Sequence, residues 1–123
     1  MILVDTSIWI DHFHASEPPL VALLRDDQVG CHRAVIEELA LGSIKQRARV
    51  LALLESLRGF PVLTHEEVMA LVDGREFWGR GLSAVDVHLL GSVMLVGGAQ
   101  LWTRDKRLLA ACRDSGAAYV KEP

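Results

Sequence analysis

The fold is decided by the N-terminal stretch Met1-Ile-Leu-Val-Asp-Thr-Ser-Ile-Trp-Ile10. Its apolar run Ile2-Leu3-Val4 is short and rich in β-branched residues, which predicts a buried strand. The run ends at Asp5, and the hydroxyls of Thr6 and Ser7 can then cap a helix that continues with further apolar residues. The stretch therefore predicts a strand followed at once by a helix, with a carboxylate at the carboxyl end of the strand.

The same alternation of strand and helix continues along the chain. Further strands are expected at residues 28–31, 60–63, 100–103 and 118–120, and helices at residues 20–25, 32–41, 44–57 and 83–96 and after residues 64 and 105. Short strands that are apolar on both faces and alternate with helices are typical of a parallel sheet covered by helices on both sides. The predicted fold class is α/β, in a single domain over residues 1–123.

The composition limits the kind of protein that the chain can be. Half of the residues are hydrophobic, which supplies a core, yet no window reaches the roughly 18 uninterrupted apolar residues of a membrane span. Cys31 and Cys112 lie far apart in no metal-binding spacing, and the N-terminus carries no basic leader. We therefore expect a cytoplasmic protein with reduced thiols and no membrane contact.

The net charge of −3 has the wrong sign for a protein that simply coats nucleic acid. If four of the 16 acidic residues were gathered around cations, however, the remainder of the chain would carry one net positive charge. Its basic residues could then form a local path for phosphate groups. The residues considered for such a path are Lys45, Arg47, Arg49, Arg80, Arg104 and Lys106.

Acidic residues lie where two of the predicted strands end. Asp5 follows the first strand directly, and Asp105 follows the strand at 100–103 by two residues. Ligands of open parallel sheets bind outside the carboxyl ends of the strands, so both carboxylates are candidates for a site. Asp86 is a third candidate, because it stands in the first turn of a helix that is apolar almost all round, where a charge needs a compensating partner such as a metal ion.

Each aspartate also has a purely structural explanation. Asp5 and Asp105 can be helix N-cap residues, and the pattern Ser83-x-x-Asp86 matches a capping box. Capping accounts for any one of them taken alone. Their joint occurrence at strand ends and on a buried helix favours a common site.

The pair Glu37-Glu38 supplies a fourth acid, and helical geometry chooses between its two members. Val35 and Leu39 define the core direction of this helix together with Ile36, and Glu38 lies about 105° from that direction and Glu37 about 155°. Glu38 therefore borders the buried face, whereas Glu37 points to water. The alternative is that both are ordinary solvated acids.

Other residues with binding chemistry are interpreted as structural. His12 and His14 are spaced like a metal-binding pair, but no third ligand is nearby in the sequence, which favours surface histidines. Trp9, Trp78 and Trp102 are interpreted as anchors of the core or of an interface and not as base-stacking platforms, because aromatic residues make up only 6% of the chain.

Four motifs in a fixed order cover nearly the whole chain. They are Met1-Ile-Leu-Val-Asp-Thr-Ser-Ile-Trp-Ile-Asp-His12, Val35-Ile-Glu-Glu-Leu-Ala-Leu-Gly42, Gly81-Leu-Ser-Ala-Val-Asp-Val-His-Leu-Leu90 and Leu101-Trp-Thr-Arg-Asp-Lys-Arg-Leu108. Through them the sequence resembles the PIN-domain ribonucleases, and specifically the VapC toxins of bacterial toxin–antitoxin pairs. The resemblance places the family's catalytic acids on Asp5, Glu38, Asp86 and Asp105, and its neighbouring hydroxyls on Ser7 and Thr103.

This resemblance carries expectations about fold, activity and partners. It implies a three-layer αβα sandwich around a short, mainly parallel sheet, and an endoribonuclease that needs Mg²⁺ or Mn²⁺ and cuts structured RNA such as tRNA or rRNA. It also implies a homodimer, a cognate VapB-type antitoxin that inserts into the active-site groove, and a larger toxin–antitoxin assembly that binds operator DNA through the antitoxin.

The chemistry of the four acids leads to the same kind of cofactor. Clustered carboxylates repel one another, and a hard divalent cation with oxygen ligands compensates them, which favours Mg²⁺ or Mn²⁺ over Zn²⁺. We expect Asp5 and Asp86 to bind the ion directly, Asp105 to complete its coordination or hold a second ion, and Glu38 to orient or deprotonate the attacking water.

Two other classes of protein share parts of this pattern. A Mg²⁺-dependent phosphotransfer enzyme of the haloacid-dehalogenase type also begins with an aspartate at a strand end, but it needs a second aspartate at the position of Ser7. A catalytically silent PIN-like module that only binds protein or RNA would not need all four acids.

Overall fold

The four strands identified within residues 1–122, the part of the chain that the computed structural model describes, form one parallel sheet in the order β3-β2-β1-β4. They are β1 (Ile2–Val4), β2 (Val29–Cys31), β3 (Arg58–Gly59) and β4 (Gln100–Trp102). The chain passes from β1 outward through β2 to β3 and then returns to pair β4 with the other side of β1. The strand order therefore reverses between β1 and β4, where open parallel sheets bind their ligands.

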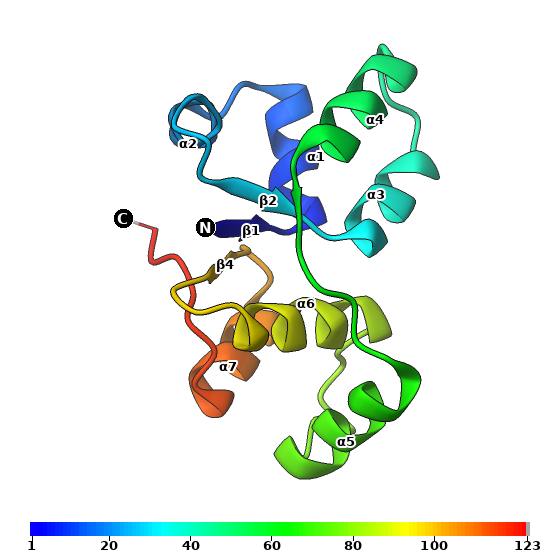
Figure 1. Ribbon diagram of the computed structural model, residues 1–123, viewed down its shortest axis with the longest axis vertical. Coiled ribbons are helices and arrows are strands. Elements are labelled where there is room, and N and C mark those ends of the chain that lie inside the picture. Colours follow the sequence, from blue (N-terminus) through cyan, green and yellow to red (C-terminus); the bar gives the residue numbers. More distant parts are fainter. Residues whose placement is uncertain (123) are drawn as a thin grey trace.

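Helices cover both faces of this sheet (Figure 1). One layer contains α1 (Thr6–His14), α2 (Pro18–Arg25), α3 (Arg33–Ala40) and α4 (Arg47–Ser56). The opposite layer contains α5 (His65–Arg75), α6 (Ala84–Leu95) and α7 (Lys106–Ser115). The predicted α/β class and the three-layer αβα arrangement are confirmed.

The core lies on both faces of the central pair of strands. Leu3 and Val4 of β1 and Leu101 of β4 are completely buried, and Trp102 is nearly so. The apolar helix α6 lies against this pair and buries most of the residues between Val87 and Val93, as expected of a helix without a polar face. The two strands at whose carboxyl ends Asp5 and Asp105 are expected are therefore part of the packed core.

Three expected boundaries were wrong. The third strand lies at residues 58–59 and not at 60–63, because Phe60 N makes one more ladder bond to Cys31 O and Pro61 then has no N–H to continue it. The helix expected from residue 44 begins at Arg47, after Gln46 in a left-handed conformation. The last strand is reduced to a bridge between Leu101 and Tyr119.

The tryptophans divide between core and surface. Trp9 and Trp102 are buried, as predicted for core anchors, but Trp78 is 61% exposed. No helix within residues 1–122 combines the length and the apolar character that crossing a membrane requires.

Candidate active site

Asp5 lies at the carboxyl end of β1 with only 8% of its surface exposed. One carboxylate oxygen, Oδ1, accepts a hydrogen bond from Thr6 N at 2.8 Å, so Asp5 caps α1. The other oxygen, Oδ2, accepts from Thr103 Oγ1 at 2.7 Å and from Ser7 Oγ at 3.1 Å. The two hydroxyls that the motifs place beside the site therefore both contact this carboxylate.

Thr103 connects Asp5 to a second acid. It is buried at the end of β4, the strand adjacent to β1, and its Oγ1 also accepts from Asp105 N at 3.1 Å. Asp105 is exposed and caps α7, because its Oδ1 accepts from Arg107 N at 2.9 Å and from Leu108 N at 3.0 Å. One buried hydroxyl thus fixes the relation between the ends of β1 and β4.

Glu38 reaches the same place from α3. Thr6 Oγ1 donates to Glu38 Oε1 at 2.7 Å, which joins the start of α1 to this glutamate. Both Glu37 and Glu38 are exposed, and the contact to α1 is made by the member of the pair that helical geometry selects. Sequence reasoning treated Thr6 only as a capping hydroxyl, since nothing local indicates a partner 32 residues away.

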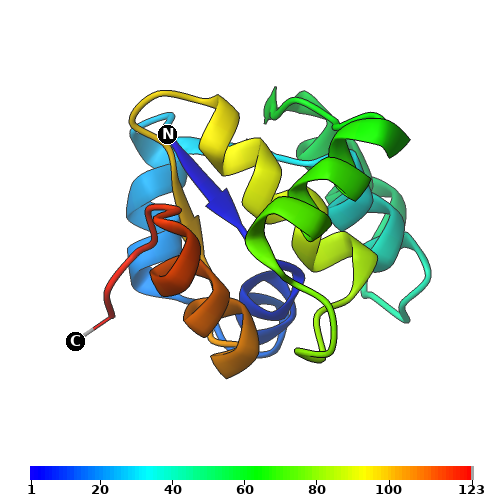
Figure 2. The same cartoon turned by 90° about the horizontal axis from the view of Figure 1, so that it is seen from below.

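Asp86 is the half-buried third residue of α6 and closes a capping box with Ser83. Its Oδ2 accepts from Ser83 N at 2.9 Å, and Asp86 N donates to Ser83 Oγ at 3.1 Å. The capping role predicted for Asp86 is therefore confirmed. Seen from below, Figure 2 shows α1 starting at the tip of β1, with the start of α7 and the segment that leads into α6 on either side.

The four charges act on one another. Burial raises the pKa of Asp5 and the nearby Glu38 charge adds to this, against the lowering effect of the bonds from Thr103, Thr6 and Ser7. Burial likewise raises the pKa of Asp86, as do the charges of Asp5 and Asp105, although the bonds from Ser83 oppose it. These carboxylates therefore hold their negative charges at a cost that a neighbouring cation would relieve.

The donor set fits a hard divalent cation. Three aspartates offer oxygen ligands of the kind that Mg²⁺ and Mn²⁺ prefer. Soft ligands are excluded, because Cys31 and Cys112 are buried and their thiol pKa values are raised by burial to about 12 and about 11. Within residues 1–122, no three His, Cys, Asp or Glu side chains already converge on a point that could hold a metal. Asp5, Asp86 and Asp105 are each turned toward their own capping donors, so the metal set stays a prediction.

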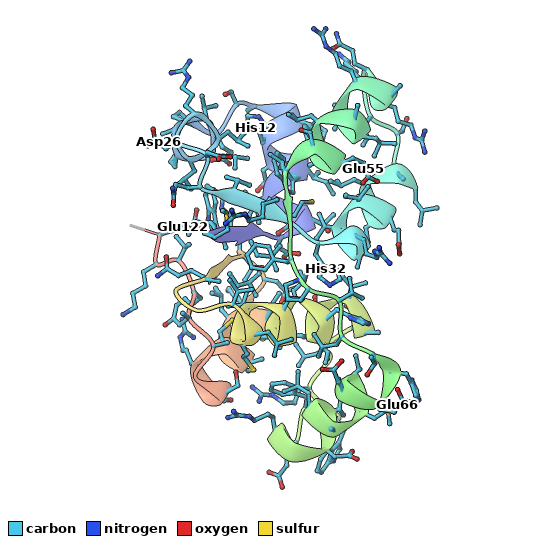
Figure 3. All side chains as sticks on the ribbon, in the orientation of Figure 1. His12, Asp26, His32, Glu55, Glu66 and Glu122 are labelled. Carbon is cyan, nitrogen blue, oxygen red and sulfur yellow. The ribbon has the colours of Figure 1, made fainter. Side chains whose placement is uncertain are left out.

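Other candidate ligands have structural roles. His12 Nδ1 accepts from Glu17 N at 3.1 Å, and its ring packs edge-on against Trp9, so it is not half of a metal pair with the exposed His14. His32 is buried at the N-cap of α3 and lies between the end of β2 and α6 (Figure 3). Its Nδ1 accepts from Ala34 N, and its ring lies 5.7 Å from the ring of His88.

Several of the basic residues are used within the protein. Arg104 binds Asp11, Glu17 and Glu122 at 2.7 to 2.8 Å and so fastens α1, the start of α2 and the C-terminal segment to the loop after β4. Arg47 donates two bonds to a main-chain carbonyl, and Arg80 pairs with Asp114. These three arginines are therefore not free to form the path for phosphates.

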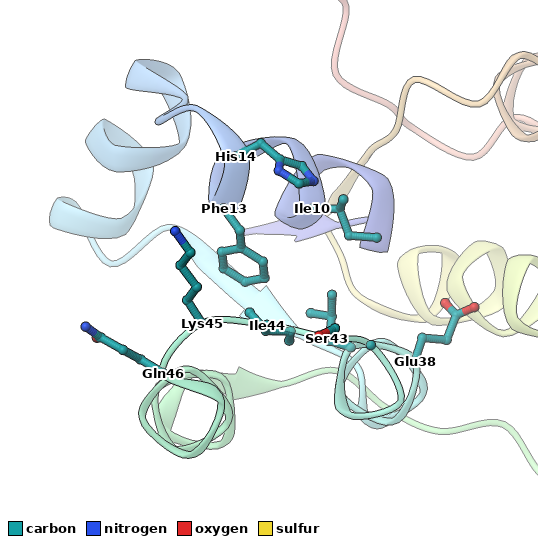
Figure 4. Close-up of a pocket in the computed structure, with 10 residues that line it drawn as sticks. Ile10, Phe13, His14, Glu38, Ser43, Ile44, Lys45 and Gln46 are labelled. Atoms are coloured by element: carbon teal, nitrogen blue, oxygen red, sulfur yellow. The ribbon is translucent and has the colours of Figure 1, made fainter.

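A groove of about 550 Å³ adjoins the acidic site (Figure 4). Its walls are mostly apolar and come from α1 and from the segment that follows α3, with Ile10, Phe13 and Ile44 among them. Glu38 stands at one end and Lys45 at the other (Figure 4). The groove could accept an extended or helical peptide with apolar anchors next to the carboxylates.

Known proteins resemble this chain in sequence and in structure. The family model described as "PIN domain" matches residues 2–114. Proteins named ribonuclease VapC32 from two Mycobacterium tuberculosis strains, CDC 1551 / Oshkosh and ATCC 25618 / H37Rv, are 66% identical over 122 residues, which cover 99% of this chain and 98% of each relative. The crystal structure of PAE2754 from Pyrobaculum aerophilum aligns over 97% of this chain and 88% of that one, with a TM-score of 0.58 and 23% identity.

Proposed function

This chain belongs to the PIN-domain family, and we propose on that premise that it is a Mg²⁺- or Mn²⁺-dependent endoribonuclease toxin whose active site is formed by Asp5, Glu38, Asp86 and Asp105. The 66% identity to VapC ribonucleases over almost the entire length identifies the chain as a ribonuclease of the VapC type. The metal, the site residues and the choice of structured RNA such as tRNA or rRNA are the proposal.

One observation carries the assignment of the site. A continuous series of hydrogen bonds joins Glu38 to Thr6, Thr6 to Asp5, Asp5 to Thr103 and Thr103 to Asp105. Asp86 makes no hydrogen bond to this series, but it lies near enough for the charges of Asp5 and Asp105 to add to the effect of burial in raising its pKa. Acids from four separate segments are thus linked at the edge of the sheet where its strand order reverses, which capping alone does not require.

The proposed roles follow from the surroundings of each carboxylate. Burial makes the ionised forms of Asp5 and Asp86 less favourable, so these two carboxylates would hold the ion. Asp105, at the start of α7, would complete the set of metal ligands. A bound divalent cation would supply charge stabilisation at the scissile phosphate and lower the pKa of water. Ser7 and Thr103 donate to Oδ2 and so oppose the rise that burial causes in the pKa of Asp5. Glu38 is exposed and held by Thr6, so it can accept the proton of the attacking water.

The VapC type also determines the expected partners. We assign the groove beside Glu38 to a segment of a VapB-type antitoxin, because its apolar walls end at a catalytic carboxylate that a bound peptide would cover. A homodimer, and an assembly that binds operator DNA through the antitoxin, complete the proposal. Copurification with a coexpressed VapB-type antitoxin tests the assignment of the groove, and light scattering tests the homodimer.

The decisive experiment is cleavage of total bacterial RNA by the purified protein. We expect cleavage in Mg²⁺, none in EDTA, and recovery when Mn²⁺ is added. Asp86→Asn should abolish cleavage, whereas Asp73→Asn, a matched change on the exposed side of α5, should leave it intact. Cleavage that survives EDTA would exclude the metal mechanism. RNA binding without any cleavage would favour the silent binding module.

A further inference from the structure

Two histidine rings lie between the helices that carry two of the proposed catalytic acids. His32 is the N-cap of α3 and is 1% exposed, and His88 lies on α6, two residues after Asp86. The ring centroids are 5.7 Å apart, with the ring planes at 53°. The helices α3 and α6 belong to opposite layers and contact each other (Figure 1). The histidines therefore meet where the helix of Glu38 approaches the helix of Asp86.

The helix cap determines which nitrogen of the His32 ring carries a proton. Ala34 N donates to His32 Nδ1 at 3.0 Å, so this nitrogen carries none. Burial lowers the pKa of His32, and His88 and Arg33 add to this effect while Glu37 opposes it. The ring is therefore neutral at pH 7, and a neutral imidazole whose Nδ1 accepts a hydrogen bond carries its proton on Nε2.

Each of the two rings has a buried nitrogen that needs a partner. These atoms are His32 Nε2 and His88 Nδ1, and neither makes a hydrogen bond to any residue in the range 1–122. Buried polar groups in folded proteins are nearly always paired. His32 Nε2 is a donor, and His88 Nδ1 is an acceptor when that ring carries its proton on Nε2. Because the torsion that turns a histidine ring is broad, a small rotation can join them.

A bond between the rings would connect the two layers beside the acidic site. Residues two apart on a helix point in directions about 160° apart, so His88 can face α3 while the Asp86 carboxylate faces elsewhere. Asp86 is held by Ser83 directly before its own helix, and Glu38 is held by Thr6 within its own layer. Neither of these bonds spans the layers. The histidine pair would therefore set the distance between Glu38 and Asp86.

We propose that His32 is a positioning residue of the nuclease, which donates from Nε2 to His88 Nδ1 and so holds α3 at a fixed distance from α6. The inference rests on the proposed ribonuclease function and adds two residues that touch neither the RNA nor the ion. Glu38 accepts the proton of a water that attacks beside the aspartates, so its position relative to Asp86 enters the rate of the chemical step.

Kinetics of RNA cleavage by His88 variants test the acceptor. His88→Phe keeps a ring but removes Nδ1, so kcat should fall at least roughly tenfold with KM within about twofold, since a displacement of about 1 Å can cost about 100-fold in rate. His88→Gln keeps an oxygen that can accept and should retain most of the wild-type kcat. His65→Phe makes the same replacement at an exposed histidine of α5 and should change neither constant.

A second variant tests the donor without removing the helix cap. His32→Asn keeps an acceptor for the N-terminus of α3 but is too short to reach α6. Its kcat should fall as in His88→Phe, and the double variant should fall no further, because both changes remove the same bond. Circular dichroism identifies any variant that does not fold. Wild-type kcat in folded His32→Asn or His88→Phe would overturn the inference, as would equal losses in His88→Phe and His88→Gln, which would assign the effect to packing.

Nitrogen NMR of the imidazole rings tests the bond without any cleavage. In the wild type both His32 and His88 should carry a proton on Nε2 and none on Nδ1. A proton on Nδ1 of either ring would overturn the inference. If the wild type cleaves RNA but lacks these tautomers, only the positioning inference fails. If it has them but cleaves no RNA, the ribonuclease proposal fails while the bond between the histidines stands.

Discussion

Replacing Asp5 by asparagine should make the metal-free protein more stable and at the same time remove its response to Mg²⁺. The side chain is buried, and burial raises its pKa, so the ionised form is unfavourable in the folded state. Asparagine keeps an oxygen that accepts from Thr6 N, and its amide can donate to the hydroxyl oxygens of Ser7 and Thr103, which rotate to accept.

The sign of the effect depends on pH. A carboxyl group whose pKa is raised by folding stabilises the folded state below the unfolded pKa of about 3.9, and this contribution is lost as the pH rises through the raised value. The side chain of the Asp5→Asn variant does not ionise, so the variant keeps this contribution to stability at every pH. In EDTA the free energy of unfolding of the variant should therefore exceed that of wild type by an amount that is smallest near pH 4 and grows toward neutrality. The difference is about 1.4 kcal/mol for every tenfold decrease that folding causes in the acid dissociation constant of Asp5.

Mg²⁺ should reverse the order of the two proteins. A ligand at 100 times its Kd stabilises the state that binds it by about 2.7 kcal/mol. For 123 residues the entropy of unfolding is roughly 0.26 kcal/mol per degree, so wild type should gain about 10 °C in Tm. The variant lacks the charge that holds the ion and should gain little.

Thermal unfolding followed by circular dichroism, in EDTA and in increasing Mg²⁺, measures both effects on the same samples. Asp73→Asn is the control for loss of a surface charge and should behave as wild type. An equal rise of Tm with Mg²⁺ in Asp5→Asn would show that Asp5 does not hold the ion. A variant less stable than wild type at neutral pH in EDTA would show that the bonds to the carboxylate outweigh its burial.

Three further predictions concern the surroundings of the site. Thr103→Val should lower kcat/KM roughly 10- to 100-fold in RNA cleavage, as expected when a bond worth about 1.5–3 kcal/mol to a charged group is lost. The hydrogen bond from Arg104 lowers the pKa of Glu122, so this pair should stabilise the folded protein above about pH 4.3 and lose its effect as the pH falls through the lowered pKa. Arg104→Gln should therefore reduce the free energy of unfolding at pH 7 but not at pH 3, which urea unfolding at the two pH values can compare. Cys31 and Cys112 should resist alkylation by iodoacetamide at pH 8 until urea unfolds the chain, because they are buried with pKa values of about 12 and about 11.

Much of the framework could be predicted because local patterns determine it. The apolar runs at residues 2–4 and 100–102 form the central strands, and the helix around residues 84–95 is buried as its composition requires. The third strand was misplaced because Phe60 to Leu63 has the composition of a strand, while the missing N–H of Pro61 limits pairing to the residues before it.

Contacts between distant segments could not be predicted from such patterns. Thr6 meets Glu38 only because the fold packs the start of α1 against the second half of α3. Trp78 was interpreted as an anchor of the core or of an interface. The neighbouring Phe77 fills the core and the turn at Gly79 directs the indole outward, so Trp78 is not a core anchor and the interface role stays a prediction. Which of two adjacent aromatic residues is buried depends on that turn, and hydrophobicity alone does not distinguish them.

Capping and cation binding are not competing explanations of the aspartates. Asp5 and Asp105 are N-cap residues and Asp86 closes a capping box, so all three carboxylates stand at helix N-termini. Unpaired N–H groups and the positive end of the helix dipole stabilise negative charge at these positions. Helices that begin near these three residues can therefore stabilise the negative charge of each carboxylate before any cation binds. The capping bonds that made each residue ambiguous in the sequence are thus compatible with the acidic site that we propose.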